Sequence, residues 1–83
     1  MSYNIAFKKS VARDLKRIDK NQTERLLGKI DEELPDKAES FPVLSGKFSG
    51  LRKFRVGNYR VIYSILGDTA LILRISHRRE VHR

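Results

Sequence analysis

Residues 51–66 read LRKFRVGNYRVIYSIL, and this segment decides the fold. Apolar side chains alternate with polar or charged ones on both sides of Gly57-Asn58, a pattern typical of two β-strands joined by a tight turn. Gly67-Asp68 has the composition of a second such turn. The segment and its continuation therefore predict antiparallel strands over residues 51–56, 59–66 and 69–76.

Two-residue turns also predict the register of the strands. Val56 then pairs with Tyr59, Arg55 lies opposite Arg60, and Arg60 lies opposite Ile75. One face of the predicted sheet is basic and holds Lys53, Arg55, Arg60, Ile75 and His77. The other face should pack against helices and holds Phe54, Val56, Tyr59, Val61, Tyr63 and Ile72. This places both tyrosines in the core, where they are not available for stacking on bases.

The first half of the chain predicts a strand and a helical hairpin. Residues 3–7 alternate as a short strand does, and apolar residues at helical spacing predict helices over residues 9–19 and 22–34. Asn21 is predicted to cap the second helix. Pro35 is predicted to end it, because proline disfavours helical geometry at the preceding residue. A connecting loop should then run to residue 50.

Together these elements predict an α+β fold, in which an N-terminal strand and a helical hairpin pack on an antiparallel β-sheet. At 83 residues, the chain is expected to form a single domain over residues 1–83. The absence of cysteine excludes a disulfide framework and a thiolate metal site. No apolar run is long enough to cross a bilayer, and the N-terminus lacks the apolar core of a signal peptide. We therefore expect a soluble cytoplasmic protein without membrane contact.

The positive charge is concentrated in the second half of the chain. Residues 1–46 hold nine Lys and Arg against eight Asp and Glu, whereas residues 47–83 hold nine against two, and the total is +8. Concentrated positive charge attracts phosphate backbones, acidic proteins or anionic lipid. Lipid is the least consistent of the three, because this half alternates like a sheet and is not a basic amphipathic helix. The sequence therefore favours a polyanionic partner, RNA above all.

The same residues resemble a known family. Residues 51–63, LRKFRVGNYRVIY, are similar to the LxRxRVGxYRVIY signature of RelE/ParE-superfamily toxins, and residues 75–81, ISHRREV, resemble their terminal HR-x-x-V-Y motif. Phe7-Lys8-Lys9-Ser10 and Leu44-Ser45-Gly46 are similar to the family as well. This resemblance covers essentially the whole chain. It implies the RelE-like microbial RNase-like fold and the toxin component of a type II toxin–antitoxin system.

The resemblance implies a ribosome-dependent endoribonuclease that cleaves mRNA in the decoding site, as RelE-type members do. Arg60 matches the arginine of the YR pair and Arg78 that of the HR pair, both phosphate-handling positions. The implied catalytic residues are Lys53, Arg55, Arg60, Arg78 and His82, with His82 at the place of the family's terminal tyrosine. Further RNA-binding residues are expected at Lys47, Arg52, His77, Arg79 and Arg83.

The chemistry of these residue types agrees with that activity. Attack by the 2′-hydroxyl needs a base, cations for the charged phosphorane and an acid for the departing oxygen. Guanidinium groups match phosphate oxygens, and histidine titrates near neutrality. We expect no cofactor and no metal, because the carboxylates that would hold a hard cation lie mostly in the helical half.

The implied partners are a small acidic antitoxin, the ribosome with its mRNA, and operator DNA only through the antitoxin complex. Two alternatives stay open at this point. ParE-type members share the fold but inhibit DNA gyrase by binding, and a catalytically weak homologue would act only as a nucleic-acid-binding module with its antitoxin.

Overall fold

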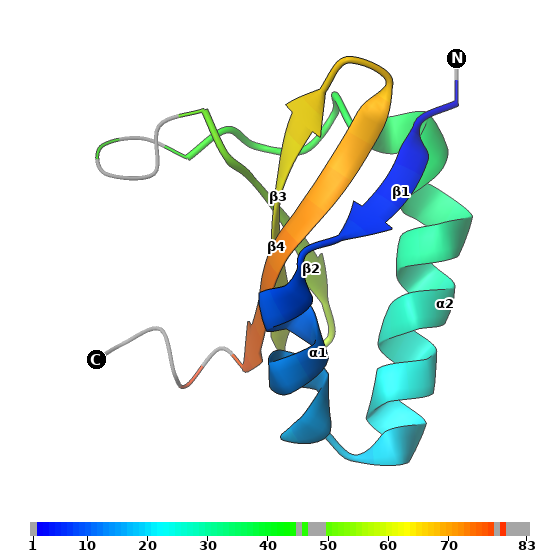
Figure 1. Ribbon diagram of the computed structural model, residues 1–83, viewed down its shortest axis with the longest axis vertical. Coiled ribbons are helices and arrows are strands. Elements are labelled where there is room, and N and C mark those ends of the chain that lie inside the picture. Colours follow the sequence, from blue (N-terminus) through cyan, green and yellow to red (C-terminus); the bar gives the residue numbers. More distant parts are fainter. Residues whose placement is uncertain (1, 45, 47–49, 78, 80–83) are drawn as a thin grey trace.

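The computed structural model describes residues 2–44, 46, 50–77 and 79, and it has the predicted α+β architecture (Figure 1). The elements in chain order are β1 (Asn4–Phe7), α1 (Lys9–Lys16), α2 (Lys20–Lys37), β2 (Arg52–Val56), β3 (Tyr59–Leu66) and β4 (Thr69–His77). The expected strand, helical hairpin and three-stranded meander are thus all present.

The four strands form one mixed sheet in the order β1-β4-β3-β2. The prediction of antiparallel pairing holds for β2, β3 and β4, whereas β1 pairs with β4 in parallel, from Asn4 opposite Thr69 to Phe7 opposite Ile72. Parallel neighbours require a long connection between them. Here α1, α2, β2 and β3 together form the connection between β1 and β4.

Glycines at the first position of both hairpin turns explain the register of the meander. Gly57 and Gly67 have φ of 58° and 62°, while Asn58 and Asp68 do not have positive φ, the combination of a type II′ turn. Such a turn matches the twist of the flanking strands and fixes the residue pairs next to it. The predicted pairs across the first turn are confirmed, with Arg55 opposite Arg60.

The predicted register across the second turn is wrong beyond Tyr63. The ladder shifts there: Tyr63 pairs with Ile72 and Ile62 pairs with Arg74, so that Leu73 is an extra residue on β4. Arg60 therefore lies opposite Ser76 and His77 lies opposite Tyr59. Because successive side chains point to opposite faces, this one-residue bulge moves Ile75 and His77 from the predicted basic face to the face that the helices cover.

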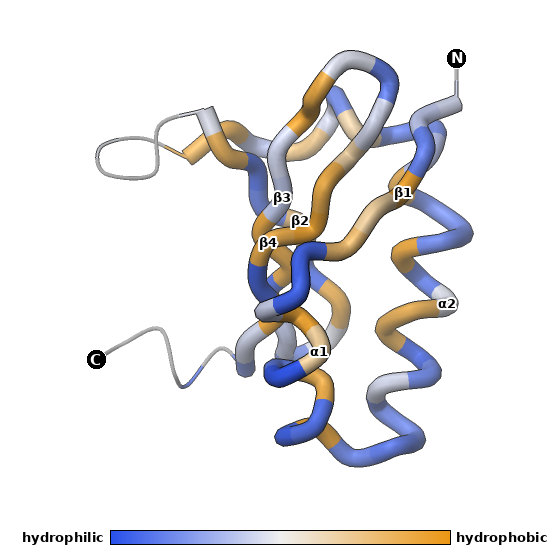
Figure 2. The backbone as a smooth tube through the Cα atoms, viewed as in Figure 1, coloured by the Kyte–Doolittle hydropathy of each residue, from blue (hydrophilic) through white to orange (hydrophobic). Residues whose placement is uncertain are grey.

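The core lies between that face of the sheet and the two helices. Its members share near-complete burial and come from every layer: Val11, Leu26, Ile30, Leu34, Ala38, Phe54, Val56, Val61, Tyr63, Ala70, Ile72 and Ile75. Figure 2 shows how hydrophobic and hydrophilic residues recur in turn along α2. Within the described residues, no helix is sufficiently long and apolar to cross a membrane.

Two predictions about α2 are wrong. The helix begins after Asp19, with no side-chain cap, so that Asn21 lies inside its first turn. It also continues through Pro35 to Lys37, because Leu34 and Ala38 extend the apolar stripe and are both 0% exposed. Burying these side chains outweighs the unfavourable backbone geometry before proline. The Tyr3 backbone N–H donates to the Pro35 carbonyl at 2.8 Å, which ties the chain start to this end of the helix.

Candidate functional site

Cationic side chains of β2, β3 and β4 share the sheet face that the helices leave open, and that of Arg74 is paired with Asp14. We call Lys53, Arg55 and Arg60 the basic face. Arg55 on β2 is the direct neighbour of Arg60 on β3, and Lys53 lies two residues before Arg55 on the same strand. Residues 52–66 and 69–77 contain no Asp or Glu, so the strands supply no carboxylate to neutralise these groups.

The environment of Arg60 indicates a site for an anion. Its Nε is buried and has no hydrogen-bond partner within the described part of the chain. The ion pairs of the described residues join Lys29, Lys37 and Arg74 to acids of the two helices, and none involves the basic face. A buried donor without an acceptor is costly, and an anion oxygen would remove that cost. Guanidinium groups donate especially well to phosphate and carboxylate oxygens.

Arg52, predicted to bind RNA, donates to the backbone of its own chain. Its Nη1 donates to the backbone carbonyls of Glu39 and Phe41 at 3.0 and 2.8 Å. The ring of Phe41 in turn packs at a tilt against Phe54, with ring centroids 4.6 Å apart. The register also places Arg52 opposite Tyr63, on the helix-covered face. Arg52 therefore anchors the segment after α2, and we leave it out of the anion site.

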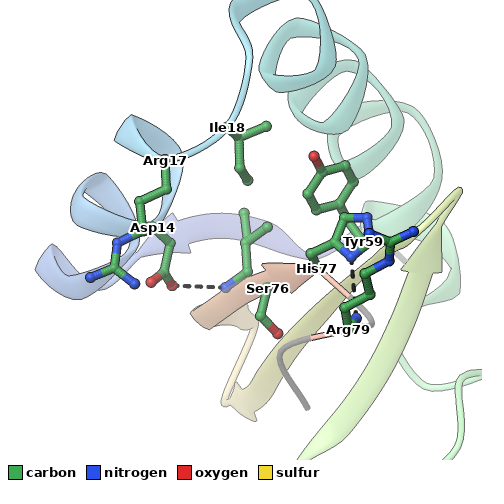
Figure 3. Close-up of a pocket in the computed structure, with 8 residues that line it drawn as sticks. Asp14, Arg17, Ile18, Tyr59, Ser76, His77 and Arg79 are labelled. Carbon is green, nitrogen blue, oxygen red and sulfur yellow. Dashed lines mark hydrogen bonds between the residues drawn. The ribbon is translucent and has the colours of Figure 1, made fainter. Parts of the chain in front are cut away.

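His77 and Arg79 lie in a pocket at the end of the sheet, and His77 and Tyr59 reach it from the opposite face to Arg60 (Figure 3). The pocket has a volume of about 290 Å³ and lies between the end of α1 and the ends of β3 and β4. Its lining comprises Asp14, Arg17, Ile18, Tyr59, Ile75, Ser76, His77 and Arg79. The bulge on β4 explains why His77 is here and not beside Arg55 and Arg60.

Four predicted site residues lie outside the described residues, namely Lys47, Arg78, His82 and Arg83. For these residues the roles implied by the sequence remain predictions. Among the residues that the structure describes, no group of His, Cys, Asp or Glu is arranged to hold a metal ion.

Asp14 is a residue that the sequence reasoning missed. Its Oδ2 accepts the backbone N–H of Ile75 at 2.9 Å and Arg74 Nε at 3.1 Å, so α1 is fixed to the edge of β4. The carboxylate side chain is only 10% exposed. A signal for this role was present, because Asp14 falls within the apolar stripe of a helix whose other charged residues are all basic.

Tyr63 is part of the core, as predicted. Its hydroxyl donates to the Ala38 carbonyl at 2.6 Å in a fully buried environment. Burial raises the pKa of Tyr63 from 10.0 to about 12, so this phenol stays protonated at neutral pH. Tyr63 therefore supports the fold beneath the basic face and is not positioned to contact RNA.

Comparison with known proteins identifies the family. A family profile described as the ParE toxin of type II toxin–antitoxin system, parDE, matches residues 5–82. The chain belongs to this toxin family. A comparison with curated protein sequences gave no match.

Solved structures of related toxins share the fold. The toxin–antitoxin complex RelBE2 from Mycobacterium tuberculosis contains a chain with 25% identity and a TM-score of 0.86, over 94% of this chain and 100% of that one. The RelE–RelB complex from Pyrococcus horikoshii OT3 gives 32% identity and a TM-score of 0.67, over 94% and 97%. A structure of the chromosomal ParDE system from P. aeruginosa gives 14% identity and a TM-score of 0.76, over 92% and 96%, a likeness of fold alone.

Proposed function

We propose that this toxin is a ribosome-dependent, metal-independent endoribonuclease that cleaves mRNA in the decoding site and so inhibits translation. The observation that carries the proposal is Arg60, whose buried Nε has no partner among the described residues and which lies directly beside Arg55. A scissile phosphate would supply the missing acceptor. The two relatives with 25% and 32% identity are RelBE and RelE–RelB complexes, which favours the RelE-type activity.

In this proposal the 2′-hydroxyl of the RNA attacks the neighbouring phosphorus and expels the 5′-oxygen of the next nucleotide. Arg55 and Arg60 bind the phosphate and stabilise the charge that develops on the phosphorane. Lys53 or His82 accepts the hydroxyl proton. The other of the two donates a proton to the departing 5′-oxygen, and Arg78 binds the phosphate. Base, cations and acid are then all supplied by side chains.

We further propose that a small acidic antitoxin neutralises this toxin in the cytoplasm. Both relatives were solved in complex with an antitoxin, and the net charge of +8 suits an acidic partner. Contact with operator DNA would then occur only through the antitoxin complex.

A second candidate function is inhibition of DNA gyrase by binding. It is favoured by the family profile, whose description names ParE, and by the likeness of fold to the ParDE structure. In that case the basic face would meet a protein or DNA surface and no bond would be cleaved.

One experiment distinguishes the two. The purified toxin is added to programmed ribosomes and the mRNA ends are mapped, while gyrase supercoiling is assayed in parallel. The variant is Arg60→Gln, and the matched control is Arg25→Gln on the exposed side of α2. We expect cuts within the decoding site that Arg60→Gln abolishes and Arg25→Gln preserves. Intact mRNA together with inhibited supercoiling would overturn the proposal in favour of gyrase.

A further inference from the structure

The pocket at the end of the sheet is not used by the proposed chemistry, yet its lining combines three kinds of surface. Ile18 and Ile75 provide apolar contact, Tyr59 and His77 provide aromatic rings, and Arg17 and Arg79 provide positive charge. The two rings meet edge to face, with centroids 5.2 Å apart and an interplanar angle of 84°. Aromatic rings beside cationic side chains are the usual surface for an unpaired nucleotide.

Two polar side chains that line the pocket, His77 and Asp14, already have hydrogen-bond partners within the protein. The backbone N–H of Arg79 donates to His77 Nδ1 at 3.2 Å, so a neutral His77 carries its proton on Nε2 and presents a donor there (Figure 3). Asp14 is engaged by the Ile75 N–H and by Arg74, and its negative charge is compensated within the protein. Arg17 and Arg79 therefore leave the pocket with a surplus of positive charge.

The pocket is adjacent to the basic face through the strand ladder. Tyr59 and His77 form one cross-strand pair, and the next pair along the ladder is Arg60 and Ser76. Because consecutive side chains point to opposite faces, the Tyr59 side chain lines the pocket while Arg60 belongs to the basic face. An RNA strand with one phosphate at Arg60 can pass around this end of the sheet and present a neighbouring base to the pocket.

We propose that this pocket binds one unpaired nucleobase of the RNA, with Arg17 and Arg79 at the adjacent phosphate, and that it contributes to the base preference around the cut. Its role in cleavage rests on the proposed function, whereas nucleotide binding does not. The volume of about 290 Å³ is at the lower limit for small-molecule sites, which suits a single nucleotide.

The direct test is nuclear magnetic resonance of the whole protein titrated with each of the four nucleoside 5′-monophosphates. We expect saturable shifts of the Tyr59 and His77 ring signals and of the Ile18 and Ile75 methyl signals. Arg17→Ala should weaken binding by about tenfold, because a charged hydrogen bond to the phosphate is lost. Arg13→Ala, which removes an exposed arginine of the same helix outside the pocket, should have no effect.

Inorganic phosphate alone should shift the Arg17 signals without moving those of Ile18 and Ile75, which separates base binding from simple anion binding. Equal effects of phosphate and nucleotides would overturn the proposal. Shifts confined to the surroundings of Lys53, Arg55 and Arg60 would overturn it too. So would shifts at the pocket that an antitoxin peptide produces and nucleotides do not.

Cleavage on ribosomes then tests the role of the pocket in base preference. On mRNAs that differ only in the bases flanking the cut, His77→Ala should reduce the discrimination between them, whereas Arg13→Ala should not. Unchanged discrimination would exclude the pocket from substrate choice. If nucleotides bind but no mRNA is cut, the proposed function fails and the nucleotide site remains. If mRNA is cut and no nucleotide binds, the function remains and this inference fails.

Discussion

Arg55 and Arg60 lie directly opposite each other on the neighbouring strands β2 and β3. Like charges in cross-strand positions destabilise an antiparallel pair, by about 0.2–1 kcal/mol. No acid lies on β2, β3 or β4 to relieve this repulsion, and Arg60 Nε has no partner among the described residues. The pair therefore costs stability in the free protein, a cost that a bound anion would offset.

Replacing one arginine of this pair should separate stability from activity. We expect Arg55→Gln to raise the free energy of unfolding at low salt by up to about 1 kcal/mol, because the repulsion with Arg60 is removed. The gain should shrink at high salt, where exposed charges are screened. The same variant should lower mRNA cleavage by at least about tenfold, since a charged hydrogen bond to phosphate is lost. Urea unfolding at both salt concentrations and mapping of mRNA ends measure the two effects.

The matched control is Arg25→Gln, which replaces an exposed arginine of α2 that lies far in sequence from Arg55 and Arg60. It removes the same charge but should leave stability nearly unchanged and cleavage intact. If both variants gained equal stability, the cause would be the net charge of the protein and not the Arg55–Arg60 pair.

The attachment of α1 to β4 gives a second prediction. Asp14→Ala should lower the free energy of unfolding by about 1–3 kcal/mol, because it removes the oxygen that accepts the buried backbone N–H of Ile75 at 2.9 Å. Arg74→Gln should cost no more than about 1 kcal/mol, since the Arg74 side chain is 60% exposed. Urea unfolding of both single variants and of the double variant measures each contribution. Equal costs for the single variants would mean that the ion pair, not the backbone contact, holds the helix.

The sequence was sufficient to predict the meander as far as the second turn. Gly57-Asn58 and Gly67-Asp68 each specify a two-residue turn, and a turn of that length fixes the register of the strands until a bulge changes it. The pairing of Arg55 with Arg60, on which the candidate anion site depends, was predicted for this reason and is confirmed. The core positions of Phe54, Val61 and Tyr63 follow from the same alternation.

The bulge on β4 was not predicted, and it changed the candidate site. Residues 70–73 read ALIL, a run in which apolar side chains on both faces conceal which residue is the extra one. The sequence feature that indicated the bulge was Ile75, because a register without a bulge places this apolar residue on the basic face. Its burial beneath α1 requires the one-residue shift, and that shift carries His77 into the pocket with Tyr59.

The parallel pairing of β1 with β4 joins segments more than sixty residues apart, which no local pattern encodes. The continuation of α2 through Pro35 is a tertiary effect as well, because it depends on the burial of Leu34 and Ala38 against the sheet. The local sequence pattern predicted correctly whether each element is a helix or a strand. Contacts between elements decided the end of α2 and the position of β1.

Tyr63 gives a prediction about alkaline pH. The folded protein holds the Tyr63 pKa at about 12 against an ordinary 10.0, so the folded state binds this proton more tightly than the unfolded state. The corresponding stability is fully present below pH 10 and is lost as the pH rises from 10 to 12. Tyr63→Phe should remove this loss. At neutral pH it should instead be less stable by about 1–3 kcal/mol, because the buried Ala38 carbonyl loses its donor.

Urea unfolding at neutral and alkaline pH measures both effects, and the two stability curves should approach each other above pH 10. Ultraviolet absorbance adds an independent readout, since Tyr63 should lose its proton near pH 12 in the folded protein and near pH 10 once the protein unfolds. A Tyr63→Phe protein whose stability falls as steeply as that of the wild type above pH 10 would show that another group is responsible.

Two glycines should respond in opposite directions to the same change. Gly28 lies within α2, where an added Cβ would meet nothing within 4 Å. Gly28→Ala should therefore raise the free energy of unfolding by about 0.5–1 kcal/mol through the better helix propensity of alanine. Gly67 also has no atom within 4 Å of a Cβ, but its φ is 62°. Gly67→Ala should lower the free energy of unfolding by about 1–2 kcal/mol, because alanine adopts that conformation at a cost.

Since neither methyl group collides with a neighbour, the difference between the two variants measures the backbone conformation alone. Gly67→Asn is the control, because asparagine tolerates positive φ better than alanine and should recover part of the loss. Thermal and urea unfolding of the three variants provide the comparison. A destabilised Gly28→Ala would indicate that α2 needs a glycine for close contact with a partner or neighbour. Equal losses for Gly67→Ala and Gly67→Asn would indicate that positive φ is not what this turn requires of residue 67.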